Sequence, residues 1–183
     1  MKYIIASDLH GSEKYVRMLV DAFNAEKADR MILLGDLLYH GPRNGLSEGY
    51  DPQKVAETLN SIKTKLICVR GNCDAEVDQL LLDFPIMAKY AVLPIGNNVL
   101  YLTHGHVYNP DNLPPLCDGD MLAFGHTHVP FAEKIGGVKC VNPGSVSLPK
   151  NGSYHGYIVL ENGTFTFKDL SGAVKREFSV SDK

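Results

Sequence analysis

Seven side chains that can bind metal ions each follow a short apolar run of the sequence. Asp8 and His10 lie in SDLHG, and His126 and His128 lie in GHTH. The remaining members of the set are Asp36, Asn72 and His104. Seven protein ligands are too many for one tetrahedral zinc, but they suit two cations that share a bridging carboxylate and a bridging hydroxide.

Such a pair of cations predicts chemistry on phosphate. Two carboxylates and one hydroxide offset only part of the charge of two divalent ions, so phosphate oxygens are attracted to the site. Metal binding also lowers the pKa of a bound water, which makes hydroxide available near neutral pH. We therefore expect in-line attack of the bridging hydroxide on the phosphorus of a phosphate ester.

The elements expected to position these residues form an alternating pattern in the first half of the chain. Apolar runs at 3–7, 31–34 and 66–69 are typical of buried strands. Between them, Ser12 can cap a helix that continues to about residue 26, and Asp51 followed by Pro52 starts another. This order predicts a parallel α/β arrangement, in which the carboxyl ends of the strands line one crevice.

The second half is mostly β. The pair Asn162-Gly163 between two apolar segments predicts a hairpin. Two packed sheets with helices outside them is the economical fold for the whole chain, and the polar loop 39–52 is a candidate lid or substrate wall. Strand-like runs lie at 99–103, 120–124, 129–135, 138–142, 156–161, 164–168 and 174–180.

The spacing of the paired ligands has a physical rationale in an extended chain. Side chains two residues apart lie on the same face of a strand. On this reasoning Asp8 and His10 point at one site, and so do His126 and His128.

The ordered motifs D-x-H, G-D, G-N, H and G-H-x-H resemble those of the calcineurin-like metallophosphoesterase superfamily, and the small phosphodiesterases within it in particular. The match extends from Asp8 to His128, and VNPGSVSLP at 141–149 continues it. The resemblance implies a two-sheet sandwich flanked by helices in four layers, α/β/β/α. It also implies a small phosphodiester substrate and a pair of metals, commonly manganese, although iron and zinc suit the same nitrogen and oxygen ligands.

The resemblance further implies how the ligands divide, with Asp36 as the bridge. One metal would be held by Asp8, His10, Asp36 and His128. The other would be held by Asp36, Asn72, His104 and His126.

The main departure from the family pattern is Cys73, which follows Asn72 where many members have histidine. Asp36, Asn72, Cys73 and His104 are the catalytic candidates, but a thiol is a poorer hydrogen-bond donor than imidazolium and carries no positive charge. A space-filling role for Cys73 is equally compatible with the sequence, and the hydroxide leaves no need for a thiol nucleophile. The GDxxDRG motif of protein phosphatases is also absent after Asp36, which disfavours that activity.

Other polar residues have weaker assignments. His106 can orient a ligand histidine or be an ordinary loop residue. Arg43 can contact a substrate phosphate or simply be solvated. We expect residues 142–145 to form a turn that supports the site.

The composition bounds the remaining questions. With 183 residues and 44% hydrophobic content, the chain is expected to form one domain, 1–183. A net charge of −3 favours small substrates over nucleic acid. The absence of an export signal or a long apolar segment predicts a cytoplasmic protein with reduced cysteines and no membrane partner. The oligomeric state, including a homo-oligomer, is left open.

Two alternatives to a phosphodiesterase remain at this stage. A phosphomonoesterase or a nuclease can use the same metal pair. A non-catalytic scaffold is also possible, because retromer contains a subunit of this fold. The complete ligand set argues against the scaffold, which has no need for all seven residues.

Overall fold

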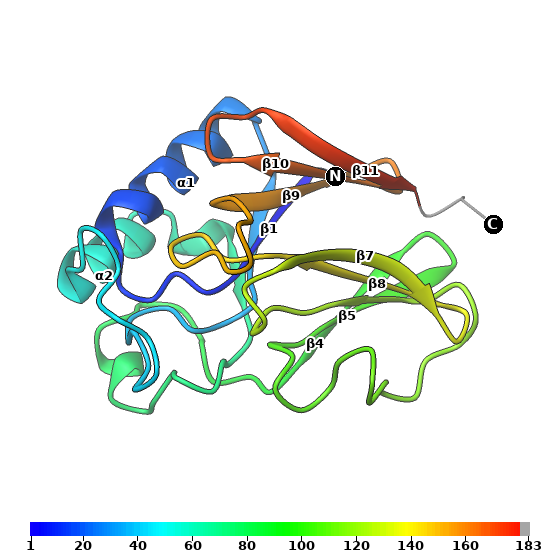
Figure 1. Cartoon of the computed structure of the whole chain (residues 1–183), viewed down its shortest axis with the longest axis horizontal. Coiled ribbons are helices and arrows are strands. Elements are labelled where there is room, and N and C mark those ends of the chain that lie inside the picture. The colour runs from blue at the N-terminus through cyan, green and yellow to red at the C-terminus, as the bar shows by residue number, and fades with distance from the viewer. Residues whose placement is uncertain (180–183) are drawn as a thin grey trace.

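The computed structural model describes residues 1–179, which form two β-sheets packed face to face. Figure 1 shows the sheet with β1, β9 and β10 lying over the sheet with β4, β5, β7 and β8. The apolar interior between them includes Ile5 and Ile32 of the first sheet and Leu100 and Met121 of the second, all fully buried. The prediction of two packed sheets is confirmed.

The first sheet has six strands in the order β11-β10-β9-β1-β2-β3. Its N-terminal strands β1, β2 and β3 are parallel, as the alternating pattern predicts, and the C-terminal strands extend the sheet in antiparallel fashion beyond β1. The strands are β1 (Tyr3–Ala6), β2 (Arg30–Leu33), β3 (Leu66–Cys68), β9 (Gly156–Glu161), β10 (Thr164–Asp169) and β11 (Val174–Ser179).

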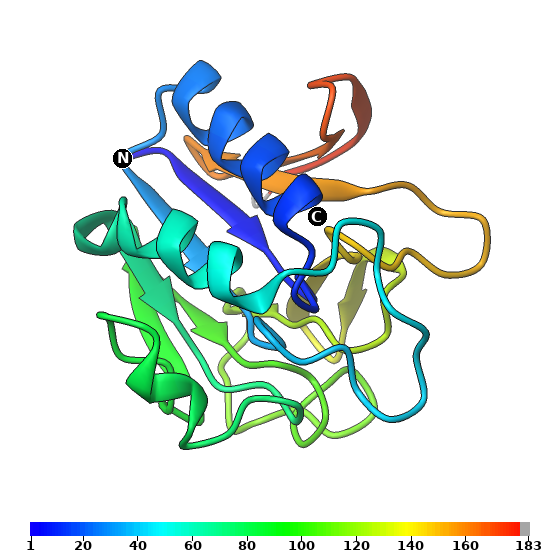
Figure 2. The ribbon, with the colours of Figure 1, turned by 90° about the vertical axis from the view of Figure 1, so that its left-hand side faces the viewer.

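Both α-helices cover the outer face of the first sheet, and they lie side by side in Figure 2. Helix α1 (Glu13–Ala25) is capped by Ser12, whose hydroxyl accepts a hydrogen bond from the Tyr15 N–H. Helix α2 (Pro52–Asn60) is capped in the same way by Asp51, which accepts from Lys54. The short 3₁₀ segments are η1 (Lys63–Lys65) and η2 (Asp78–Leu80).

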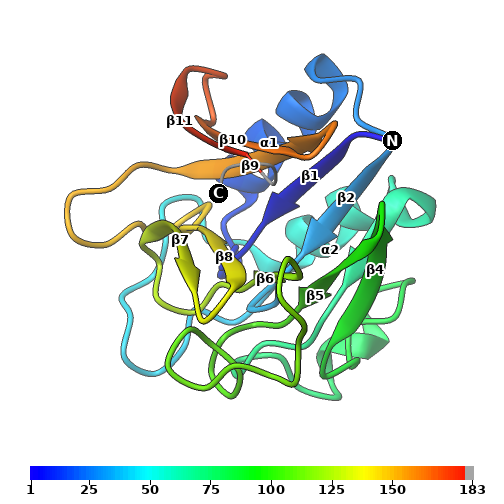
Figure 3. The same cartoon turned by 90° about the vertical axis from the view of Figure 1, so that its right-hand side faces the viewer.

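The second sheet has the order β4-β5-β6-β8-β7, and Figure 3 shows it facing the first. Its central strands β5, β6 and β8 are parallel to one another. In the described residues its outer face is covered by loop side chains such as Tyr108, Leu113 and Leu116, where the family resemblance implies helices. The strands are β4 (Ala91–Ile95), β5 (Asn98–Leu102), β6 (Met121–Ala123), β7 (Pro130–Ile135) and β8 (Val138–Pro143).

The expected strands all form, with ends that differ by no more than one residue. The Asn162-Gly163 turn joins β9 to β10 with Glu161 opposite Thr164, which confirms the hairpin. Strand β4 is missing from the sequence prediction because Pro94 interrupts its pattern, and proline is tolerated there since β4 is an edge strand. Residue 180 of the predicted run 174–180 lies outside the described residues.

No helix within residues 1–179 has the length and apolar content needed to cross a bilayer. The four cysteines are free thiols, and two of them, Cys68 and Cys140, are buried.

Candidate metal centre

The candidate ligands lie in the loops after five strands that come from both sheets. Strands β1, β2 and β3 of the first sheet precede Asp8 and His10, Asp36, and Asn72 respectively, while β5 and β6 of the second precede His104 and His126. The sequence pattern predicts that these strand ends line one crevice. The structure instead forms the site where the carboxyl ends of two parallel sets, one in each sheet, meet.

The backbone of the ligands differs from the extended geometry expected for them. Asp8, His10, His126 and His128 have φ values of 57°, 43°, 67° and 62°, and Asp36 has 56°. These are left-handed conformations, which are unfavourable for residues other than glycine. The explanation of the paired spacing by an extended strand is therefore wrong, although the side chains do converge. Strained backbone of this kind is concentrated at functional sites.

The first group of ligand atoms comprises Asp8, His10 and His128. Their ligand atoms all lie within 4.8 Å of one another. Asp8 Oδ1 is 3.2 Å from His128 Nε2 and 3.6 Å from His10 Nε2. All three side chains are buried, and Asp8 Oδ1 has no partner in hydrogen-bond geometry among the described residues.

The hydrogen bonds of the histidines favour Nε2 as the ligand atom. Nδ1 of His10 donates to the Tyr39 carbonyl at 2.8 Å, and Nδ1 of His128 donates to the Leu148 carbonyl at 2.7 Å. With the proton on Nδ1, each Nε2 carries a lone pair, yet these two Nε2 atoms are 3.1 Å apart. A cation beside them removes this unfavourable contact, so these residues fit a metal ion.

The second group is centred on Asp36 and His104. Asp36 Oδ2 is 3.3 Å from His104 Nε2 and 3.8 Å from His10 Nε2, so this carboxylate touches histidines of both groups. His104 Nδ1 donates to the Leu34 carbonyl at 2.7 Å, which again leaves Nε2 for a ligand. Asn72 Oδ1 lies 3.1 Å from that Nε2.

His126 completes the set from the rim of the site. Its ring centroid is 5.1 Å from that of His104, and its backbone N–H donates to Asp8 Oδ2 at 3.0 Å. The structure therefore brings all seven candidates together, with Asp36 between the two groups.

The charges of these groups are strongly coupled. Burial alone raises the pKa of Asp8, but the close contacts of its carboxylate with the His10 and His128 rings outweigh burial and hold that pKa well below its usual range. Burial likewise opposes the ionisation of Asp36, and its hydrogen bond with His104 lowers the pKa overall. In His104, burial favours the neutral ring, but the Asp36 carboxylate raises its pKa to about 9, so a cation that binds at Nε2 has to displace the proton that this carboxylate attracts. Both carboxylates are thus anionic at neutral pH, as cation binding requires.

Asp74 supports the site and was missed by the sequence reasoning. Its carboxylate is buried and accepts from the backbone N–H groups of Asp36, Leu37 and Gly71 at 2.9, 2.8 and 2.7 Å. These bonds tie the loop after β2 to the loop after β3. Its position directly after Asn72-Cys73 was the signal that could have drawn attention to it.

Cys73 lies beside Asp36, the carboxylate between the two groups of candidate ligands. Its backbone N–H donates to Asp36 Oδ1 at 2.8 Å. Burial, followed by the negative charge of Asp36, raises the pKa of the thiol to about 12. Cys73 is therefore a neutral thiol at physiological pH, which argues against a nucleophilic role.

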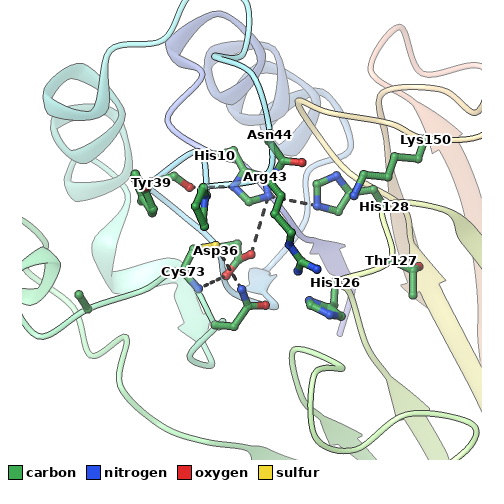
Figure 4. A pocket seen from close by; sticks show the side chains of 14 residues that line it. His10, Asp36, Tyr39, Arg43, Asn44, Cys73, His126, Thr127, His128 and Lys150 are labelled. Atoms are coloured by element: carbon green, nitrogen blue, oxygen red, sulfur yellow. Dashed lines mark hydrogen bonds and ion pairs between the residues drawn. The ribbon is translucent and has the colours of Figure 1, made fainter.

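A cavity of about 840 Å³ is lined by five of the candidate ligands, His10, Asp36, Asn72, His126 and His128. The 39–52 loop forms one wall through Gly41, Pro42, Arg43 and Asn44, as expected for a substrate wall. In Figure 4 the Arg43 side chain extends from this loop into the pocket, while Lys150 extends toward His128 from another side. Sequence reasoning missed Lys150, because it follows the last motif in an ordinary polar turn.

The segment 142–147 supports the loops that carry the ligands, through side chains as well as backbone. Asn142 Nδ2 donates to the Gly125 carbonyl at 2.8 Å, and the hydroxyls of Ser145 and Ser147 donate to the Asp8 carbonyl at 2.7 and 3.1 Å. Satisfying this carbonyl helps to hold Asp8 in its left-handed conformation.

His106 lies near the candidate ligands but does not support any of them. Its ring centroid is 5.4 Å from that of His104, but within the described chain it makes no hydrogen bond to the site histidines. It therefore lies beside the ligands without orienting one of them.

Comparison with known proteins places this geometry in a family. Residues 1–164 match the model of the calcineurin-like phosphoesterase superfamily domain. The chain is 50% identical over 162 residues to phosphodiesterase YfcE of Escherichia coli K12, which covers 88% of each protein. The solved structure of E. coli Yfce, described as a phosphoesterase, superposes with a TM-score of 0.96 over 99% of this chain and 100% of that one, at 44% identity.

A more distant match shows the fold alone. Vps29 of Entamoeba histolytica superposes with a TM-score of 0.63 over 98% of this chain and 99% of that one, at 19% identity. The extent of the family match and the half-identical relative settle the classification. The chain is a phosphoester hydrolase that belongs to the calcineurin-like phosphoesterase superfamily.

Proposed function

We propose that this protein is a phosphodiesterase that hydrolyses a small phosphodiester by in-line attack of a hydroxide held between two divalent cations, with manganese as the favoured metal. The observation that carries the proposal is the convergence of imidazole Nε2 atoms and carboxylate oxygens at the base of an open cavity. The half-identical phosphodiesterase from E. coli supports the choice of a diester.

The metal ligands divide between the two groups described above. Asp8, His10 and His128 would hold one cation, and Asn72, His104 and His126 the other, with Asp36 shared. When bound, the cations would supply positive charge for the phosphate oxygens and a water acidic enough to attack at neutral pH.

The remaining residues of the pocket orient the substrate. Arg43 and Lys150 project into the cavity, and neither forms an ion pair with a carboxylate in the described part of the chain. Both are free to bind the phosphate oxygens that the cations do not contact. The neutral Cys73 thiol, next to Asp36, offers a weak donor near the reacting phosphate.

Metal reconstitution in a parallel assay tests the proposal. The purified protein is treated with a chelator, reloaded with Mn²⁺, Fe²⁺ or Zn²⁺, and assayed on a diester, a monoester and single-stranded DNA. We expect chelation to abolish diester hydrolysis and Mn²⁺ to restore it best, with two equivalents of metal bound per chain. Higher activity on the monoester or on DNA would contradict the choice of substrate.

The same assay separates enzyme from scaffold. A scaffold of this fold would show no metal-dependent hydrolysis of any of the three substrates.

We also propose that residues 1–183 act as one domain, which the shared interior of the two sheets supports. We propose a cytoplasmic location as well, because the free thiols are compatible with a reducing compartment.

A further inference from the structure

A second cavity, of about 540 Å³, adjoins the metal centre. It shares Asn72 with the first cavity, and no other lining residue is common to both. His106, which also lines it, lies next to the ring of His104. A chemical group bound in this second cavity would therefore be adjacent to a phosphate bound at the metal centre.

One side of the second cavity is aromatic. The ring of Tyr90 stacks on that of Tyr101 with centroids 5.0 Å apart and planes 12° apart, and Tyr108 meets Tyr101 edge-on. Tyr90 is nevertheless 54% exposed. Because Tyr101 covers one face of the Tyr90 ring, the exposed surface includes the other face, which can stack on a flat ligand.

The cavity also carries unpaired positive charge. Arg70 and Lys89 line it, and neither is within ion-pair distance of a carboxylate in residues 1–179. The Arg70 Nε–H donates to the Asp74 carbonyl at 3.1 Å, which anchors the guanidinium while its terminal N–H groups stay available. No acidic side chain lines the cavity. The second cavity is thus suited to an anion beside a flat ring.

We propose that the second cavity binds the part of the substrate that lies beyond the scissile phosphate, and that this part carries a flat ring and a second anionic group, as a nucleoside phosphate does. The ring would stack on Tyr90, and the anion would be held by Arg70 and Lys89. The inference rests on the proposed phosphodiesterase function and narrows its substrate class to small nucleotide diesters.

Three diesters with the same 4-nitrophenyl leaving group test this. The second ester group is methyl, thymidine 5′-yl, or thymidine 5′-yl with a 3′-phosphate. On the Mn²⁺-loaded protein we expect kcat/KM to rise about ten-fold when the nucleoside is added. A further three- to five-fold rise is expected from the 3′-phosphate. Equal kcat/KM values for the three diesters would overturn the proposal.

Variants assign each gain to its residue through the ratio of kcat/KM values. Tyr90→Leu should abolish the gain from the nucleoside, whereas Tyr90→Phe, which keeps the ring, should retain it. Lys89→Gln should abolish the gain from the 3′-phosphate. Lys89 lies just before β4, which is one edge strand of the second sheet. The matched control is Lys134→Gln, which removes a charge at an exposed position of β7, the other edge strand of that sheet. Gains that persist in Tyr90→Leu and Lys89→Gln would place the nucleoside elsewhere.

A binding measurement separates this inference from the proposed function. Calorimetric titration with thymidine 3′,5′-bisphosphate requires no turnover, and its affinity should fall several-fold in Tyr90→Leu and Lys89→Gln. If no diester is hydrolysed but this pattern of binding holds, the phosphodiesterase proposal fails and the subsite stands. If the methyl diester is hydrolysed but the bisphosphate binds all variants equally, the subsite fails alone.

Discussion

The Asp74 carboxylate holds Asp36 in place through the backbone, since Asp74 Oδ2 accepts from the Asp36 N–H at 2.9 Å. The same carboxylate accepts from Leu37 and Gly71. Asp74 thus connects the loops after β2 and β3 and positions the carboxylate that lies between the two groups of candidate ligands. Asp74 needs no contact with a metal to control how that carboxylate is presented.

Replacing Asp74 by asparagine should destabilise the protein and weaken metal binding together. The amide nitrogen cannot accept a hydrogen bond, so at least one buried N–H loses its partner at a cost of about 2 kcal/mol. Urea denaturation measures the loss in free energy of unfolding, and Mn²⁺ titration measures the affinity. Asp83→Asn is the matched control, because Asp83 forms an exposed pair with Lys63 and its loss should cost less than about 1 kcal/mol. Equal effects of the two substitutions would contradict this role for Asp74.

A methyl group at Gly71 should disrupt the metal centre sterically. A Cβ there would lie 2.1 Å from Asp36 Oδ1 and 2.4 Å from the Asp36 nitrogen, so the ligand must move. We expect Gly71→Ala to lower Mn²⁺ affinity and diester turnover by roughly ten-fold or more, the size of effect found when support of a ligand is lost. Gly45→Ala, where the new Cβ meets nothing within 4 Å, should leave both unchanged. Native metal affinity in Gly71→Ala would refute the steric argument.

The thiol at position 73 should make the rate depend strongly on the leaving group. A neutral thiol with a pKa of about 12 is a poor proton donor, so aryl diesters, whose leaving groups depart without protonation, should react faster than alkyl diesters. Comparing kcat at saturating metal measures the ratio. Cys73→His should lower the aryl-to-alkyl ratio of kcat by roughly ten-fold or more, because the imidazole can act as a general acid for the alkyl leaving group. Cys73→Ser, whose side chain is of similar size to cysteine, should leave the ratio unchanged. Equal native rates for aryl and alkyl diesters would exclude the idea.

Asp169 should contribute pH-dependent stability far from the metal centre. Hydrogen bonds from Lys175 and Ser171 lower the pKa of Asp169 to about 2, below its value in the unfolded chain. Its stabilisation is therefore complete above about pH 4 and is lost as the pH falls through about 2. Since the group is largely solvated, Asp169→Asn should cost about 1 kcal/mol at pH 7. Urea midpoints measured from pH 7 down to pH 2 should converge for the native and variant proteins, and a constant difference would contradict the assignment.

The sequence by itself determined which residue types follow each strand and where most strands and both helices lie. Those features depend on local patterns, such as the apolar runs before Asp8 and Asp36 and the caps at Ser12 and Asp51. The motif order also indicated the family, which the matches to known proteins confirm.

Only the tertiary structure decided how the ligands are presented. The left-handed backbone of Asp8 depends on hydrogen bonds from a segment more than a hundred residues away, as with the Ser145 hydroxyl at the Asp8 carbonyl. The support from Asp74 and the cavity beside Tyr90 arise in the same way, from loops that become neighbours when the strands pair and the two sheets pack. A local pattern of residues holds no information about such contacts, because their partners are chosen by strand pairing and sheet packing.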